Sequence, residues 1–209
     1  MASARNLAKR IQSRAEKGLR FDLDTPGKER LSDCLEFYKT EREWVKEQHR
    51  DGASGLEVAS GLSAIVDCLV KTLSEAAFVS YRQAANGNTV AISLVAIGGY
   101  GRSELCPLSD VDLMFLYPSN TNPKSLEIAQ EHLVRNILYI LWDTGLKVGH
   151  STRTVDDAFT EARKDIQTKT ALLESRLVYG SHSLYEGFEN SYNLFYRNED
   201  PKGYIQQRL

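Results

Sequence analysis

The chain has 209 residues, of which 42% are hydrophobic and 26% are charged, a balance typical of a soluble globular protein. Its net charge of -2 gives no global attraction to DNA or to an anionic membrane, although a local basic patch is not excluded. Cys34, Cys68 and Cys106 show no paired spacing, which favours a reducing compartment over a disulfide framework. The N-terminus lacks the apolar core of a secretory signal and no apolar run could span a bilayer, so we expect a cytoplasmic protein.

The first third of the chain predicts helices. Residues 28–50 carry a partial apolar stripe at three- and four-residue spacing, and residues 56–82 carry a stronger one. The breaker DGASG at 51–55 separates the two. We therefore expect residues 1–85 to form a helical N-terminal extension.

The hydrophobic period then changes from that of helices to that of strands. Residues 89–97 are short, apolar and rich in β-branched side chains, which predicts a buried strand. A second strand is predicted over 110–117, a helix over 124–142 and a third strand over 146–154.

Helices are predicted after the third strand. Thr154 and Asp157 resemble a capping box at the start of a helix over 155–164. Another helix is expected over 168–179, ended by Gly180.

The order of these elements predicts helices, then a small sheet with a crossing helix, then helices, which is an α+β fold whose strand order the sequence does not fix. Residues 86–209 are expected to form one domain, with a core over 89–180 and a helical tail over 181–209. The aromatic side chains of this tail are expected to pack rather than to stack on bases.

A glycine-rich segment, GGYGRSELCPLSDVDLMFLYP at 98–118, joins the first two strands. Backbone amides at Gly98, Gly99 and Gly101 can approach an anion closely, because no side chain blocks them. Arg102 can pair with phosphate oxygens, or with Glu104 in a purely structural alternative. A tight turn without a ligand is the alternative for the glycines.

Two aspartates open the second strand. Asp110 and Asp112 are two residues apart, so their side chains point to the same face of a strand. Because like charges repel, the pair predicts a shared divalent cation, and hard oxygen ligands suit Mg²⁺ or Mn²⁺. With the glycine turn ten residues upstream, the pattern predicts nucleotidyl transfer, in which a nucleophile attacks the α-phosphate of a nucleoside triphosphate.

This arrangement of two glycines, a gap and Asp-x-Asp on an apolar strand resembles the DNA polymerase β-type nucleotidyltransferase superfamily. The full segment is similar to the nucleotidyltransferase domain of the bacterial PII uridylyltransferase/uridylyl-removing enzymes. Two later blocks match in the same order, LWDTGLKVGHSTRT at 141–154 and DIQTKTALLESRLVYG at 165–180. The resemblance covers about residues 90–205.

The resemblance implies a fold, an activity and a site. The fold is the α+β polymerase β-type nucleotidyltransferase fold, with a small mixed sheet flanked by helices. It implies transfer of UMP from UTP to a tyrosine of a PII-type nitrogen-signalling protein, with Mg²⁺ or Mn²⁺ as cofactor. Gly98 and Gly99 would hold the triphosphate, with Arg102 and Ser109 close to it. The two aspartates would bind the metal and organise the attack.

Two departures from the family pattern keep other functions open. The third carboxylate that the superfamily places on a neighbouring strand is missing, since only Gly149, His150 and Ser151 stand there. The HD and ACT domains of the full enzyme have no counterpart in this sequence. The chain is therefore expected to be a fragment, a truncated form or a short homologue that lacks these domains. The alternatives are a related enzyme with another nucleotide or acceptor, and a non-catalytic nucleotide-sensing or partner-docking module.

Overall fold

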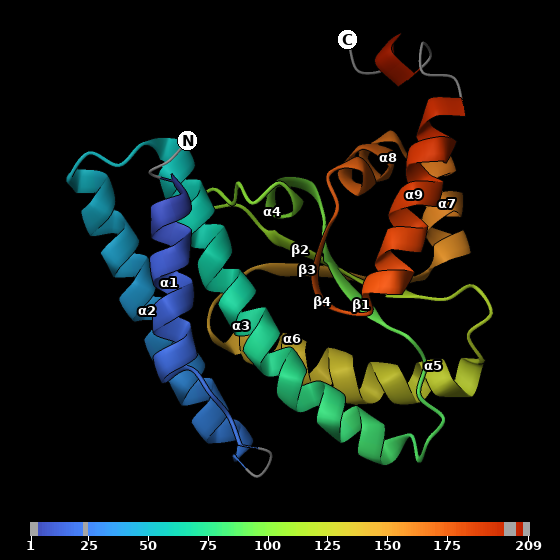
Figure 1. Ribbon diagram of the computed structural model, residues 1–209, viewed down its shortest axis with the longest axis horizontal. Coiled ribbons are helices and arrows are strands. Elements are labelled where there is room, and N and C mark those ends of the chain that lie inside the picture. The colour runs from blue at the N-terminus through green and yellow to red at the C-terminus, as the bar shows by residue number, and fades with distance from the viewer. Residues whose placement is uncertain (1–3, 23–24, 199–203, 207–209) are drawn as a thin grey trace. The chain divides into compact units, whose positions relative to one another are not determined.

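A computed structural model describes residues 4–22, 25–198 and 204–206 (Figure 1). The chain forms two compact units whose segments interleave along the sequence. The first comprises Met1–Thr89, Ser103–Val111 and Asn122–Gly149, and the second comprises Val90–Arg102, Asp112–Thr121 and His150–Leu209. The division expected between residues 85 and 86 stays a prediction.

Three helices dominate the first unit: α1 (Ala4–Gly18), α2 (Gly27–Arg50) and α3 (Gly55–Ala84). Both α1 and α2 pack along α3 (Figure 1). A capping box starts α3, in which the Ser54 amide donates to the Glu57 carboxylate at 2.6 Å and the Ser54 hydroxyl accepts from the Glu57 amide at 3.4 Å.

The predicted helix over 124–142 is present but is not uniform. It consists of α5 (Pro123–Ala129), a π-helical segment η1 (Gln130–Val134) and α6 (Arg135–Asp143). All three contact α3 within the first unit. The side chain of Asn122 accepts from the Lys124 amide at 2.9 Å and begins the stretch.

The sheet has four strands in the order β3-β2-β1-β4. They are β1 (Ser93–Ala96), β2 (Val111–Tyr117), β3 (Val148–Thr154) and β4 (Arg176–Gly180). Strand β1 is antiparallel to both β2 and β4. The Val111 amide donates to the Lys147 carbonyl at 2.8 Å, so β2 and β3 begin side by side and the sheet is mixed, as predicted.

The helix predicted over 168–179 is wrong in its second half. The helix α8 ends early (Ile166–Leu173), and the chain continues as β4. Residues 176–179 are Arg-Leu-Val-Tyr, which suit a strand, and they pair with β1, for example Leu94 opposite Tyr179. The predicted first strand is also too long, because β1 covers Ser93–Ala96 within the predicted range 89–97.

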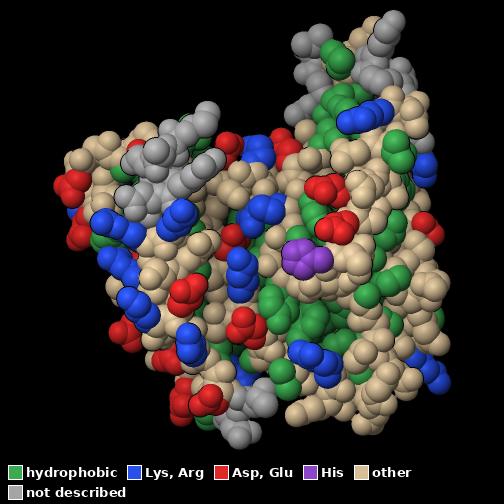
Figure 2. All heavy atoms as spheres, viewed as in Figure 1, with side chains coloured by type: hydrophobic (Ala, Val, Ile, Leu, Met, Phe, Trp, Pro, Cys, Tyr) green, Lys and Arg blue, Asp and Glu red, His purple; other side chains and the backbone are tan. Residues whose placement is uncertain are grey.

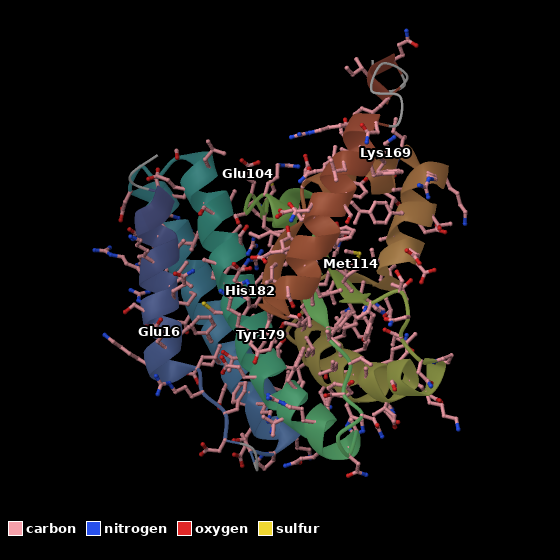
Figure 3. All side chains as sticks on the ribbon, turned by 45° about the vertical axis from the view of Figure 1, so that its right-hand side comes forward. Glu16, Glu104, Met114, Lys169, Tyr179 and His182 are labelled. Atoms are coloured by element: carbon pink, nitrogen blue, oxygen red, sulfur yellow. The ribbon has the colours of Figure 1, made fainter. Side chains whose placement is uncertain are left out.

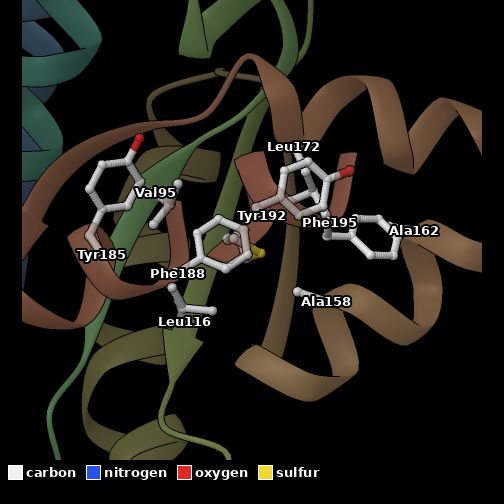
Figure 4. Packing of buried hydrophobic residues seen from close by; sticks show 10 residues of the cluster. Val95, Leu116, Ala158, Ala162, Leu172, Tyr185, Phe188, Tyr192 and Phe195 are labelled. Atoms are coloured by element: carbon white, nitrogen blue, oxygen red, sulfur yellow. The ribbon is translucent and has the colours of Figure 1, made fainter. Parts of the chain in front are cut away.

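Helices α7 (Val155–Lys164), α8 and α9 (His182–Asn198) cover one face of the sheet within the second unit (Figure 4). The predicted capping box is confirmed, since the Thr154 hydroxyl accepts from the Asp157 amide at 3.2 Å and the Asp157 carboxylate accepts from the Thr154 amide. The core beneath these helices consists of Val95, Met114, Leu116, Ala158, Ala162, Leu172, Tyr185, Phe188, Tyr192 and Phe195.

The aromatic tail packs, as expected, over the residues that the structure describes. Phe188 is stacked on Tyr192 with ring centroids 5.6 Å apart. Lys169 of α8, labelled in Figure 3, places its ammonium 5.3 Å from the ring centroid of Phe195. The Thr170 hydroxyl lies 2.7 Å from that of Tyr204, while residues 199–203 and 207–209 of the predicted tail lie outside the described part.

The mixture of charges on the surface and the absence of disulfides among the three cysteines agree with the amino-acid composition. Acidic and basic side chains are interspersed on the face that Figure 2 shows. Over the described residues, we find no helix with the length and apolar character needed to cross a bilayer. All three cysteines are free, and burial raises the pKa of the Cys34 and Cys68 thiols to about 12.

Candidate functional site

Antiparallel pairing of β1 with β2 brings the glycine turn beside Asp112. Ala96 is opposite Leu113, and one residue further the Ile97 amide donates to the Asp112 carbonyl at 3.1 Å. Gly98 follows directly, and a Cβ atom on it would lie 3.9 Å from Oδ2 of Asp112. The first glycine of the turn and the second aspartate of the pair are therefore neighbours.

The turn itself is a single helical turn, α4 (Gly98–Gly101). Gly98 has φ +60°, a left-handed conformation that favours glycine. The Gly101 and Arg102 amides are used within the turn, donating to the carbonyls of Ile97 at 3.1 Å and Gly98 at 3.0 Å. Gly98 and Gly99 are half-buried, so their backbone is partly accessible.

Exposure alternates along the start of β2. Asp110 directly precedes the strand and is exposed, Val111 is buried, Asp112 is exposed and Leu113 is buried. This two-residue alternation supports the prediction that both carboxylates point to one face. Ser109 is exposed as well. Because Mg²⁺ and Mn²⁺ bind one or two carboxylates together with substrate phosphates, a metal ion held by Asp110 and Asp112 stays a prediction.

Strand β3 lies next to β2, where the superfamily pattern calls for a third acid. Gly149 and His150 are exposed there, and the strand contains no carboxylate. Across the described ranges, no cluster of three or more Asp, Glu, His or Cys side chains is suited to hold a metal ion. The candidate metal ligands are therefore Asp110 and Asp112.

Arg102 pairs with a carboxylate that sequence reasoning did not connect with it. Its Nη1 donates to Oε2 of Glu174, which directly follows α8. The side chains of Arg102 and Glu174 are 44% and 29% exposed. An Arg102–Glu104 pair stays a prediction.

Arg176 is a second residue that sequence reasoning missed. Its guanidinium donates from Nε to the Gly101 carbonyl and from Nη2 to the Tyr100 carbonyl, both at 3.2 Å. Glu174 and Arg176 both lie in the matching block at 165–180, which was the available signal. Their expected place in a helix hid their relation to the turn.

Comparison with known proteins identifies a matching family and several relatives of the chain. Residues 52–139 match the family described as glutamate-ammonia ligase adenylyltransferase. The bifunctional uridylyltransferase/uridylyl-removing enzyme of Novosphingobium aromaticivorans is 37% identical over 158 residues, which are 75% of this chain and 17% of that protein. The enzyme of Erythrobacter litoralis is 39% identical over 135 residues, which are 64% of this chain and 14% of that protein. The enzyme of Azospirillum brasilense is 49% identical over 92 residues, which are 44% of this chain and 9% of that protein.

The chain is homologous to bifunctional uridylyltransferase/uridylyl-removing enzymes. Its mixed four-stranded sheet flanked by helices, together with the matched nucleotidyltransferase-type family, shows the α+β nucleotidyltransferase fold that the resemblance implied. The chain spans 17%, 14% and 9% of the length of the three relatives named above.

Proposed function

We propose that this chain is a metal-dependent nucleotidyltransferase that transfers UMP from UTP to a tyrosine of a PII-type signalling protein in the cytoplasm. The observation that carries the proposal is the placement of Gly98 beside Asp112, 3.9 Å from Oδ2 to a Cβ position. It puts a backbone that an anion can approach next to a carboxylate that can hold a cation. The names of the homologues support the choice of UMP, and the choice of the acceptor rests on the resemblance of the sequence motifs.

Each residue of the site has a role in this proposal. The backbone of Gly98 and Gly99 would face the triphosphate, with Arg102 and Ser109 toward its oxygens. Asp110 and Asp112 would hold Mg²⁺ or Mn²⁺, which when bound neutralises charge that develops on the transferred phosphoryl group.

Bond changes in the proposed transfer are simple. The tyrosine oxygen forms a bond to the α-phosphorus, and the bond from that phosphorus to the bridging oxygen breaks, which releases pyrophosphate. Because a tyrosine hydroxyl has a pKa near 10, its proton must be removed. One of the two aspartate carboxylates, or water, would accept it.

An intact-mass assay tests the proposal. The chain is incubated with PII, UTP and Mg²⁺ or Mn²⁺, in parallel with an Asp110→Ala variant and with excess EDTA. We expect a UMP-sized gain on PII with the wild type alone, lost in the variant and on chelation. A gain that survives in both would contradict the metal site, whereas UTP binding without any transfer would favour the nucleotide-sensing module.

A second candidate is transfer of AMP from ATP, which the matched adenylyltransferase family favours. The same assay distinguishes the two when ATP replaces UTP and glutamate-ammonia ligase replaces PII. An AMP-sized gain on the ligase, without a UMP-sized gain on PII, would replace the first candidate with the second.

A further inference from the structure

The junction between α8 and β4 holds the glycine turn through its backbone. A Cβ atom on Gly101 would lie 1.8 Å from the carbonyl oxygen of Glu174 and 3.0 Å from that of Ala96. Such a close approach of two backbones leaves room for glycine alone. The place of the turn is therefore tied to the backbone of Glu174.

Arg176 adds side-chain contacts to the same turn. Besides its two hydrogen bonds to the carbonyls of Tyr100 and Gly101, its guanidinium lies 5.4 Å from the ring centroid of Tyr100. Arg176 is opposite Ala96 in the register of β4 with β1, so the sheet fixes its backbone. A planar guanidinium can donate two bonds at fixed angles, a geometry that a lysine ammonium does not reproduce.

The Glu174 carboxylate forms an ion pair with Arg102, the residue that ends the turn. Its ion pair with Arg102 restrains a long side chain that is 44% exposed. A side chain ordered before a ligand arrives loses less conformational entropy when the ligand binds. The pair therefore prepares Arg102 for an anion.

We propose that Glu174 and Arg176, here called the turn clamp, are positioning residues for binding of a nucleoside triphosphate. This inference rests on the proposed function. One end of the turn, at Gly98, lies beside Asp112, and the turn clamp holds the other end at Gly101 and Arg102. The clamp thus sets where the backbone of the turn meets the phosphates, without contacting the substrate itself.

Equilibrium binding of UTP, UMP and ATP to the 209-residue chain, with Mg²⁺ present, tests the turn clamp. Arg176→Lys keeps the positive charge but loses the planar guanidinium that donates two hydrogen bonds to the turn. We therefore expect the Kd for UTP to rise about tenfold and the Kd for UMP to change less than about twofold. Glu174→Gln should raise the Kd for UTP about threefold. Arg163→Lys is the matched control, because Arg163 lies 4.9 Å from the ring centroid of Phe195 and should leave both constants unchanged.

Several outcomes would overturn the inference. An equal loss of UTP and UMP affinity in Arg176→Lys would assign a general structural role, and an unchanged Kd for UTP in a folded variant would remove any role. If Arg176→Lys fails to fold in a circular-dichroism melt, Glu174→Gln decides, since unchanged or tighter UTP binding contradicts the clamp. If the wild type binds neither UTP nor ATP, both the proposed function and the inference are contradicted. If the wild type binds UTP but the variants bind it with unchanged Kd values, the inference alone is contradicted.

Discussion

At the scale of residues, the aspartates of the candidate site are exposed, whereas the other side chains of β2 are buried. From Val111 to Tyr117 every side chain of β2 is buried except that of Asp112. A charged group is tolerated at this end of the strand because it keeps its contact with solvent. An exposed carboxylate at this position is accessible to a ligand from solvent.

Asp112→Asn should abolish transfer while the fold stays intact. The variant keeps the size of the side chain but loses the charge that a cation needs, so we expect activity to fall about a thousandfold, or about 4 kcal/mol. The intact-mass assay with PII and UTP measures the loss. Asp33→Asn, at an exposed position of α2, is the matched control, and a folded Asp112→Asn protein with near wild-type transfer would show that the site is misassigned.

The cap of α8 predicts a pH dependence. Hydrogen bonds from the Thr168 hydroxyl and then from the Thr168 amide hold the pKa of Asp165 below its ordinary value of 3.8. Because the folded state lowers this pKa, the carboxylate contributes stability that is complete above about pH 3.8 and is lost as the pH falls further. Urea titrations between pH 6 and pH 2.5 should therefore show the advantage of the wild type over Asp165→Asn shrinking at the acid end, and a constant difference would contradict the cap.

At the scale of elements, β4 depends on one glycine as much as on its strand-forming residues. Gly180 has φ +105°, and a Cβ atom on it would lie 2.2 Å from the carbonyl oxygen of Ile92. The Ser181 amide donates to the same carbonyl at 2.8 Å. Gly180 thus lets the chain leave β4 tightly against the start of β1 and enter α9.

Gly180→Ala should destabilise the protein strongly. The backbone conformation and the clash act together, so we expect the free energy of unfolding to fall by about 3 kcal/mol or more. Gly187→Ala on α9 is the control, because a Cβ atom there meets nothing within 4 Å and alanine favours a helix by about 0.5–1 kcal/mol. Urea denaturation of both variants checks the prediction, and equal effects would mean that the exit from β4 is not tightly constrained.

At the scale of the whole molecule, each compact unit has a core assembled from distant parts of the sequence. In the second unit, residues of β1 and β2 meet those of α7, α8 and α9 (Figure 4). This core supports the strands from which the glycine turn and Asp112 project. Packing of the aromatic tail is therefore a condition for the site, although no tail residue belongs to it.

Phe188→Ala should test that dependence. Phe188 is 1% exposed and contacts the rings of Phe159, Tyr185 and Tyr192, so the cavity should cost about 3–5 kcal/mol of unfolding free energy. Leu194→Ala, on the same helix but 60% exposed, should change stability by less than about 0.5 kcal/mol. Urea denaturation measures both, and a small effect of Phe188→Ala would show that the sheet does not rely on α9.

Features of this protein that depend on local patterns can be predicted from the amino-acid sequence. Helical periodicity, the Thr154 capping box and the alternation around Asp110 and Asp112 all involve residues within a few positions of one another. Their physics is local, so the helices predicted over 28–50 and 56–82 and the three predicted strands are found in the structure with shifts at their ends, whereas the second half of the helix predicted over 168–179 is not.

Features that need a partner from a distant part of the chain could not be predicted from local patterns. Strand β4 forms because β1 offers it hydrogen bonds, Gly101 is required because the Glu174 backbone touches it, and Arg102 is oriented by a carboxylate 72 residues away. The residues around 174–179 are compatible with both helix and strand, and pairing across the sheet determines which one forms. Such contacts leave no periodic trace in the sequence.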